Sequence, residues 1–123
     1  MENNEESEEL SLLDIDDRRD PEEKAREGKS GNVKYEIEQH RSEGSNTTKG
    51  KVIEVGKISE SKHKDLRKLV DEGYTHYAIF RLEDRSTTTI VQDKAGKLFK
   101  VYSFSMSDVK VSNRVTITVF TDQ

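Results

Sequence analysis

Three histidines are the side chains of this sequence that most readily bind metals or carry protons. His40, His63 and His76 lie far apart along the chain, and none has a partner at the short spacing that is typical of a metal site. The chain contains no cysteine, which excludes disulfides and thiolate chemistry. We therefore expect histidines at the surface or rim of the fold, and neither a metal nor a cofactor.

An acid and a lysine on one predicted strand form a second candidate site. Glu54 and Lys57 resemble the acid–lysine pair of metal-dependent nucleases. Such a site needs a further upstream carboxylate to hold Mg²⁺, usually an aspartate, and no aspartate lies between Asp20 and Glu54. The sequence also lacks a Gly-x-Ser-x-Gly elbow and a glycine-rich phosphate loop. We therefore predict that the protein is not an enzyme.

Basic side chains gather on a helix predicted over residues 59–72 and near a hairpin predicted at residues 93–97. Lysine and arginine neutralise phosphates, and Tyr35, Tyr77 and Tyr102 could stack bases if their sheet face were open. The alternative is an ordinary solvated helix face, for which acids interspersed among the bases are typical, and a sheet edge guarded by lysines. The candidate nucleic-acid-binding residues are Lys57, Lys62, Lys64, Arg67, Lys68, Lys94, Lys97 and Lys100.

An apolar stretch lies among acidic residues near the amino end. Its four large aliphatic side chains are the only ones before Val33, and a groove on a partner could bury them. Residues 9–13 resemble the clamp-binding pentapeptide of bacterial replication proteins except at the first and last positions, and residues 12–16 are similar to a clathrin-binding box. Packing of the stretch on its own domain is the alternative. The predicted partner-binding residues are Leu10, Leu12, Leu13 and Ile15.

Composition divides the chain near residue 32. Residues 1–32 carry twelve acids, five bases and no aromatic residue, whereas residues 33–123 carry thirteen acids and sixteen bases. A segment so acidic and so poor in apolar residues cannot bury enough surface to offset the entropy lost on ordering. We therefore predict a disordered acidic arm over residues 1–32 and one small domain over residues 33–123.

No apolar run approaches the length needed to span a membrane. The first residues, Met-Glu-Asn-Asn-Glu-Glu, lack the basic and apolar regions of a secretory signal. We therefore expect a soluble, cytoplasmic protein that does not act at a membrane.

The residue patterns predict strands over residues 33–38, 51–58, 74–83, 87–92, 98–106 and 109–120, the last as one strand or two. Apolar and polar residues alternate over 33–38 and near the end of 109–120, whereas 74–83 is apolar on both faces and 87–92 is rich in β-branched residues. Residues 41–50 are polar and predict a flexible loop, and residues 20–28 carry the start and stop signals of a short helix. The helix over residues 59–72 has one apolar stripe, so it should cover one sheet face. The side chains predicted to be buried together are Leu66, Leu69, Val70, Ala78, Phe80, Ile117 and Val119.

These patterns predict an α+β fold. It is a small antiparallel or mixed sheet of five to six strands, with one helix packed on one face, preceded by the disordered acidic arm. The predicted function is that of a non-enzymatic binding or adaptor protein that contacts a protein partner through the arm and the domain. The alternative is a nucleic-acid-binding protein whose acidic arm competes with phosphate for the basic surface.

Overall fold

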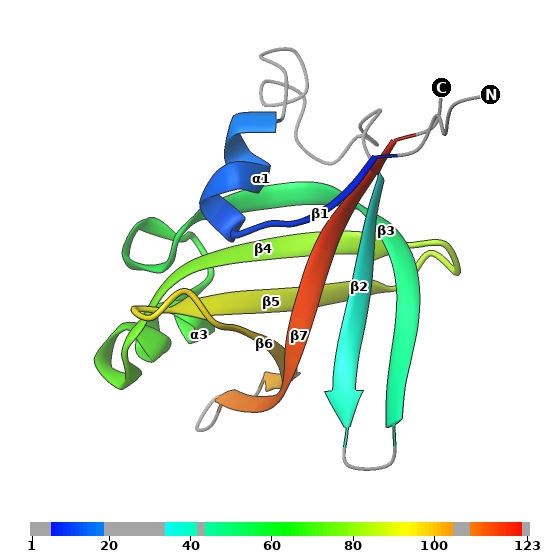
Figure 1. Cartoon of the computed structure of the whole chain (residues 1–123). Coiled ribbons are helices and arrows are strands. Elements are labelled where there is room, and N and C mark those ends of the chain that lie inside the picture. The colour runs from blue at the N-terminus through cyan, green and yellow to red at the C-terminus, as the bar shows by residue number, and fades with distance from the viewer. Residues whose placement is uncertain (1–5, 19–33, 42–43, 105–108, 122–123) are drawn as a thin grey trace, which may run out of the picture.

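The computed structural model describes residues 6–18, 34–41, 44–104 and 109–121 (Figure 1). Strands dominate the described residues, and the helical segments, which include the short 3₁₀ helices η1 and η2, are few and brief. In chain order the elements are β1 (Glu6–Glu9), α1 (Leu12–Arg18), β2 (Lys34–Arg41), β3 (Gly44–Lys57), η1 (Ile58–Glu60), α3 (Lys64–Arg67), η2 (Lys68–Glu72), β4 (Tyr74–Leu82), β5 (Thr87–Asp93), β6 (Leu98–Phe104) and β7 (Val109–Thr121).

The strands form one antiparallel sheet that closes on itself. Strands β2 to β7 pair with their neighbours in chain order, and β7 pairs with β2 as well as β6, which completes the circle. The first strand, β1, joins β7 along residues 118–121, beyond the stretch that pairs with β6. The prediction of an antiparallel or mixed sheet is thus confirmed, and all the described pairings are antiparallel. The described residues form seven strands rather than five or six, because the amino-terminal segment contributes one.

The inner face of the closed sheet holds the main core. Residues that alternate along each strand point inward, as do Ala78 and Phe80 in β4 and Ile117 and Val119 in β7, and all four are fully buried. The rings of Tyr35 and Phe80 meet edge to face with their centroids 5.7 Å apart, a favoured geometry for aromatic pairs.

The amino-terminal segment seals one end of this closed sheet. Leu10, Leu12 and Ile15 are buried in the main core, and α1 lies across β3 and β4 (Figure 1). The Leu12 amide donates to Oε1 of Gln92 in β5 at 3.3 Å. The Leu10 amide donates to the carbonyl of Ile117 in β7 at 2.9 Å.

The prediction of disorder over residues 1–32 is therefore wrong for residues 6–18, which form β1 and α1. Composition counts only the apolar residues inside the arm, whereas the closed sheet supplies the apolar surroundings that bury them. Residues 1–5 and 19–33, including the helix predicted at residues 20–28, lie outside the described residues.

A second, smaller core lies on the outer face of the sheet. Ile58, Leu66 and Leu69 from η1, α3 and η2 pack there with Tyr77, Val91 and Val101 of strands β4 to β6. The helical segment therefore covers one sheet face as predicted, although it is three short helices rather than one.

The prediction that seven named side chains share one core is wrong. Leu66 and Leu69 belong to the outer core, whereas Phe80 and its inward neighbours belong to the inner one, because a sheet keeps its two faces apart. Val70 is 40% exposed and lies in neither core.

The region predicted as a polar loop over residues 41–50 is mostly strand. Strand β3 begins at Gly44 and pairs with β2 from Arg41 to Tyr35. Its polar residues suit it because their side chains are largely exposed in this part of the hairpin. The last strand is continuous from Val109 to Thr121, which selects one strand over two.

Candidate functional site

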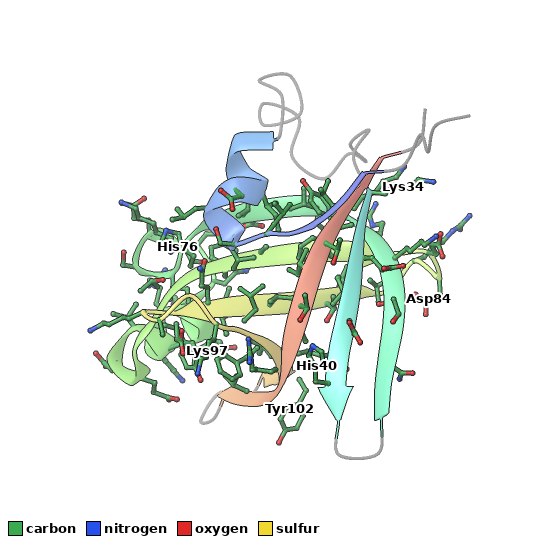
Figure 2. The ribbon with its side chains drawn as sticks, in the orientation of Figure 1. Lys34, His40, His76, Asp84, Lys97 and Tyr102 are labelled. Carbon is green, nitrogen blue, oxygen red and sulfur yellow. The ribbon has the colours of Figure 1, made fainter. Side chains whose placement is uncertain are left out.

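Four basic side chains line a hollow on the outer face of β2, β3 and β4. The hollow has a volume of about 330 Å³, and its cations are Lys34, Lys49, Lys51 and Arg81. We name it the basic hollow. Figure 2 shows Lys34 at the start of β2.

The strand register brings these cations together. Lys51 and Arg81 are direct cross-strand partners between β3 and β4. Lys34 precedes Tyr35, and the partner of Tyr35 is Gly50, so Lys34 lies beside Lys51 across the β2–β3 pair. Like charges directly opposite each other destabilise a sheet. Repulsion among Lys34, Lys51 and Arg81 therefore destabilises this part of the sheet, and a bound anion would reduce the repulsion.

The floor of the basic hollow depends on Gly50. A β-carbon at this position would lie 2.8 Å from the carbonyl oxygen of Arg81 and 3.0 Å from the side chain of Leu82. A larger residue would therefore push β3 away from β4. The glycine lets the two strands approach closely beside the pair of Lys51 and Arg81.

Among the described residues, the carboxylates that border the basic hollow lie on the side of Lys49 and Glu83. Glu83 is part of its lining, and Glu36 is the cross-strand partner of Lys49. An adjoining hollow of about 540 Å³ is lined by Glu36, Glu83 and Asp84 together with Lys49. The surface is thus basic at Lys34, Lys51 and Arg81 and mixed in charge beyond Lys49.

The residues predicted to bind nucleic acid occupy three places. The end of β3 and the helical segment expose five of them, which are Lys57, Lys62, Lys64, Arg67 and Lys68. There Arg67 donates to the Ser61 carbonyl at 2.6 Å, and Lys68 lies 3.9 Å from Asp65. Two more, Lys94 and Lys97, are exposed at the β5–β6 turn. Figure 2 shows Lys97 across the view from Lys34. Lys100 lines a cavity inside the closed sheet. Nucleic-acid binding by these residues stays a prediction.

The four residues predicted to bind a partner differ in accessibility. Leu10, Leu12 and Ile15 lie in the inner core, whereas Leu13 is 53% exposed on α1. The described arrangement therefore presents only Leu13 to a partner. Binding through all four side chains stays a prediction, and it requires α1 to leave the closed sheet.

Glu54, His63 and Tyr77 form a polar cluster that ties the helical segment to the sheet. The Tyr77 hydroxyl donates to Oε2 of Glu54. Nε2 of His63 lies 3.2 and 3.1 Å from the two carboxylate oxygens, and the rings of His63 and Tyr77 meet edge to face with centroids 6.1 Å apart. Desolvation by burial raises the pKa of Glu54, but the hydrogen bonds from Tyr77 and His63 outweigh it and the pKa is lowered.

The lowered pKa of Glu54 predicts a pH-dependent contribution to stability. A carboxyl whose folded pKa is depressed stabilises the fold above its unfolded value, and this contribution is lost as pH falls through the folded pKa. Glu54→Gln should therefore be less stable than wild type near pH 7, and the difference should shrink below about pH 4. Urea unfolding of wild type and Glu54→Gln near pH 7 and below about pH 4 measures this difference. The control is Glu60→Gln, at an exposed position of η1. A difference that is the same at both pH values would contradict this role.

The described part of the chain holds no group of three or more histidines, cysteines, aspartates or glutamates arranged to bind a metal ion. Within the same residues, no helix is long and apolar enough to cross a membrane. No protein-family model, curated protein or solved structure matches the chain. We therefore infer the function of the protein from its surfaces and cavities.

Proposed function

We propose that the protein is a non-catalytic binding protein that recognises an acidic segment of a protein partner through the basic hollow. The observation that carries this proposal is the placement of Lys51 directly opposite Arg81, with Lys34 beside them. A sheet gains nothing from like charges in register. Carboxylates seated between these cations would convert the repulsion into attraction.

The size of the basic hollow favours a short acidic segment. Its cations span three neighbouring strands, a distance of about 10 Å at the usual spacing between strands. Two or three carboxylates of an extended peptide cover such a distance, because side chains on one face of a strand repeat about every 7 Å. Charge complementarity of this kind speeds association and selects partners more than it adds affinity.

The surroundings of the basic hollow disfavour a nucleic acid at this place. A polynucleotide carries a regular series of phosphates, and its backbone would continue past Glu83 toward Glu36 and Asp84. No aromatic side chain is among the described residues that line the hollow, so bases would find no stacking platform. A peptide can place acids over the cations and neutral residues over the carboxylates.

Charge reversal tests the proposal. Lys51→Glu with Arg81→Glu should weaken binding of a labelled acidic peptide of about ten residues at least about tenfold, since two attractions become repulsions. The matched control is Lys94→Glu with Lys97→Glu, which makes the same change in net charge at the exposed β5–β6 turn. Fluorescence anisotropy at about 50 mM salt measures both.

Three results are informative. Loss of peptide binding in the variant with Lys51→Glu and Arg81→Glu, with less than about a twofold change in the control, supports binding in the basic hollow. Equal losses in both variants would show that only net charge matters and would contradict a defined site. Binding of a single-stranded oligonucleotide that is tighter than that of the peptide, with a steep salt dependence, would favour the nucleic-acid alternative.

A further inference from the structure

A second hollow lies on the outer face of the sheet, where α3 meets β4 and β5. Its volume is about 470 Å³. The more buried side chains that line it are Leu66 of α3, Ile79 of β4 and Thr89 of β5. Leu66 belongs to the outer core and Ile79 packs against it, so the hollow is an uncovered continuation of that core. We name it the apolar hollow.

The strand register makes the two hollows neighbours. Arg81 of the basic hollow is the direct cross-strand partner of Thr87, and Thr87 lines the apolar hollow. Ile79 precedes Arg81 by two residues, so both side chains point to the outer face of β4. The row of outward residues formed by Lys51, Arg81 and Thr87 therefore leads from the basic hollow into the apolar hollow.

The charges around the apolar hollow suit an acidic segment. Among the described residues that line it, the carboxylate is that of Asp65, which lies 3.9 Å from the ammonium of Lys68. Glu54, the cross-strand partner of Ile79, accepts hydrogen bonds within the polar cluster. Lys64 is exposed and adds a cation to the lining. A negatively charged segment thus meets cations on both sides of the apolar hollow, since Arg81 lies at its other side.

The distances along the row set the pattern of the segment. From Lys34 to Thr87 the row crosses four neighbouring strands, a span of about 14 Å at the usual strand spacing. Side chains on one face of an extended peptide repeat about every 7 Å. Three such side chains therefore cover the row, two of them over the cations and the third over the apolar hollow.

We propose that the acidic segment bound in the basic hollow also inserts a large aliphatic side chain into the apolar hollow, two residues beyond its nearer acid. This inference rests on the proposed function and names the residue that gives the segment its affinity. Charge pairs mainly speed association and select partners, whereas burial of an apolar side chain contributes affinity directly. A hollow of about 470 Å³ has room for such a side chain.

The test compares two labelled peptides on the full chain. The first, Leu-Ser-Glu-Ser-Glu-Ser-Leu, has the same residue order in both directions, so a leucine reaches the apolar hollow whichever way the peptide runs. The second has serine in place of both leucines. Fluorescence anisotropy at about 50 mM salt should show that the leucine peptide binds at least about tenfold more tightly.

Protein variants locate the site of the leucine. Ile79→Thr removes aliphatic surface from the apolar hollow and should reduce the ratio of the two affinities to less than about threefold. The matched control is Val70→Thr, at an exposed position of η2, which should keep the tenfold ratio. Lys51→Glu with Arg81→Glu should weaken both peptides by the same factor, because it acts on the acids that they share.

Each failure has a distinct meaning. Equal affinities of the two peptides for wild type would overturn this inference, and the proposed function would stand if Lys51→Glu with Arg81→Glu still weakened both. Absence of binding by either peptide would overturn both proposals. An unchanged ratio in Ile79→Thr would overturn the apolar hollow as the place of the leucine. Concentration-dependent amide shifts at Ile79 and Thr89 in the protein alone would show that a second copy fills the hollow and would overturn the peptide as its occupant.

Discussion

Leu12→Ala is expected to lower the free energy of unfolding by about 2–5 kcal/mol, whereas Leu13→Ala should change it by less than about 0.5 kcal/mol. Leu12 is fully buried among the inner-core residues, and its neighbour Leu13 is 53% exposed. The first change leaves a cavity at the sealed end of the closed sheet, and the second removes a side chain that water already surrounds. The two substitutions are chemically identical, so each controls for the other.

Urea unfolding of the two variants measures this contrast. The sequence alone predicts that neither substitution alters the stability of the domain, because it places both leucines on a disordered arm. Their burial in the structure changes the expectation for Leu12 only. Equal stability of Leu12→Ala, Leu13→Ala and wild type would show that α1 does not seal the closed sheet in solution.

Phe80→Ala is expected to cost about 3–5 kcal/mol. Phe80 is fully buried in the inner core, and its ring lies edge to face with Tyr35 at a centroid distance of 5.7 Å. Backbone pairing on both sides of β4 limits how far the closed sheet could collapse into the space left by the ring. Tyr102→Ala, at a position 56% exposed, is the control and should be close to wild type.

Thermal and urea unfolding of both aromatic variants check this expectation. A loss of only a few tenths of a kcal/mol in Phe80→Ala, with the fold intact, would place Phe80 outside the core. A large loss in Tyr102→Ala would show that the open end of the sheet is packed more tightly than its exposure indicates.

The residue patterns predict most of the sheet. Alternation of apolar and polar residues locates β7 nearly to its observed ends, because one face of that strand is buried in the inner core. Strands β4 and β5 are found instead from their runs of apolar and β-branched residues, because both of their faces are buried. The start of β3 could not be found in this way. Its residues from Gly44 to Lys49 are mostly exposed and polar, so they carry no alternation that separates a strand from a loop.

The burial of the amino-terminal segment could not be predicted from composition. The amide of Leu12 meets the side chain of Gln92, eighty residues later in the chain. A local window sees only that the segment is acidic and has few apolar residues. The closing of the sheet creates an apolar end, and this end gives Leu10 and Ile15 a place to be buried.

The basic hollow follows from register, which a single sequence does not specify. The predicted strands place Lys34, Lys51 and Arg81 each beside an inward residue, so their outward direction could have been found from the alternation. Their adjacency depends on which residues pair across β2, β3 and β4. The same holds for Lys100, whose spacing from Leu98 indicates the inner face although its charge favours the surface.

The most direct measurement is an amide-shift titration of the full ¹⁵N-labelled chain with the acidic peptide. Binding in the basic hollow predicts shifts centred on Lys49, Lys51 and Arg81, with the amides of residues 10–15 unchanged because α1 remains in place. Shifts centred on residues 10–15, with Lys51 and Arg81 unchanged, would contradict this site. They would show instead that α1 leaves the closed sheet and that the leucines bind the partner.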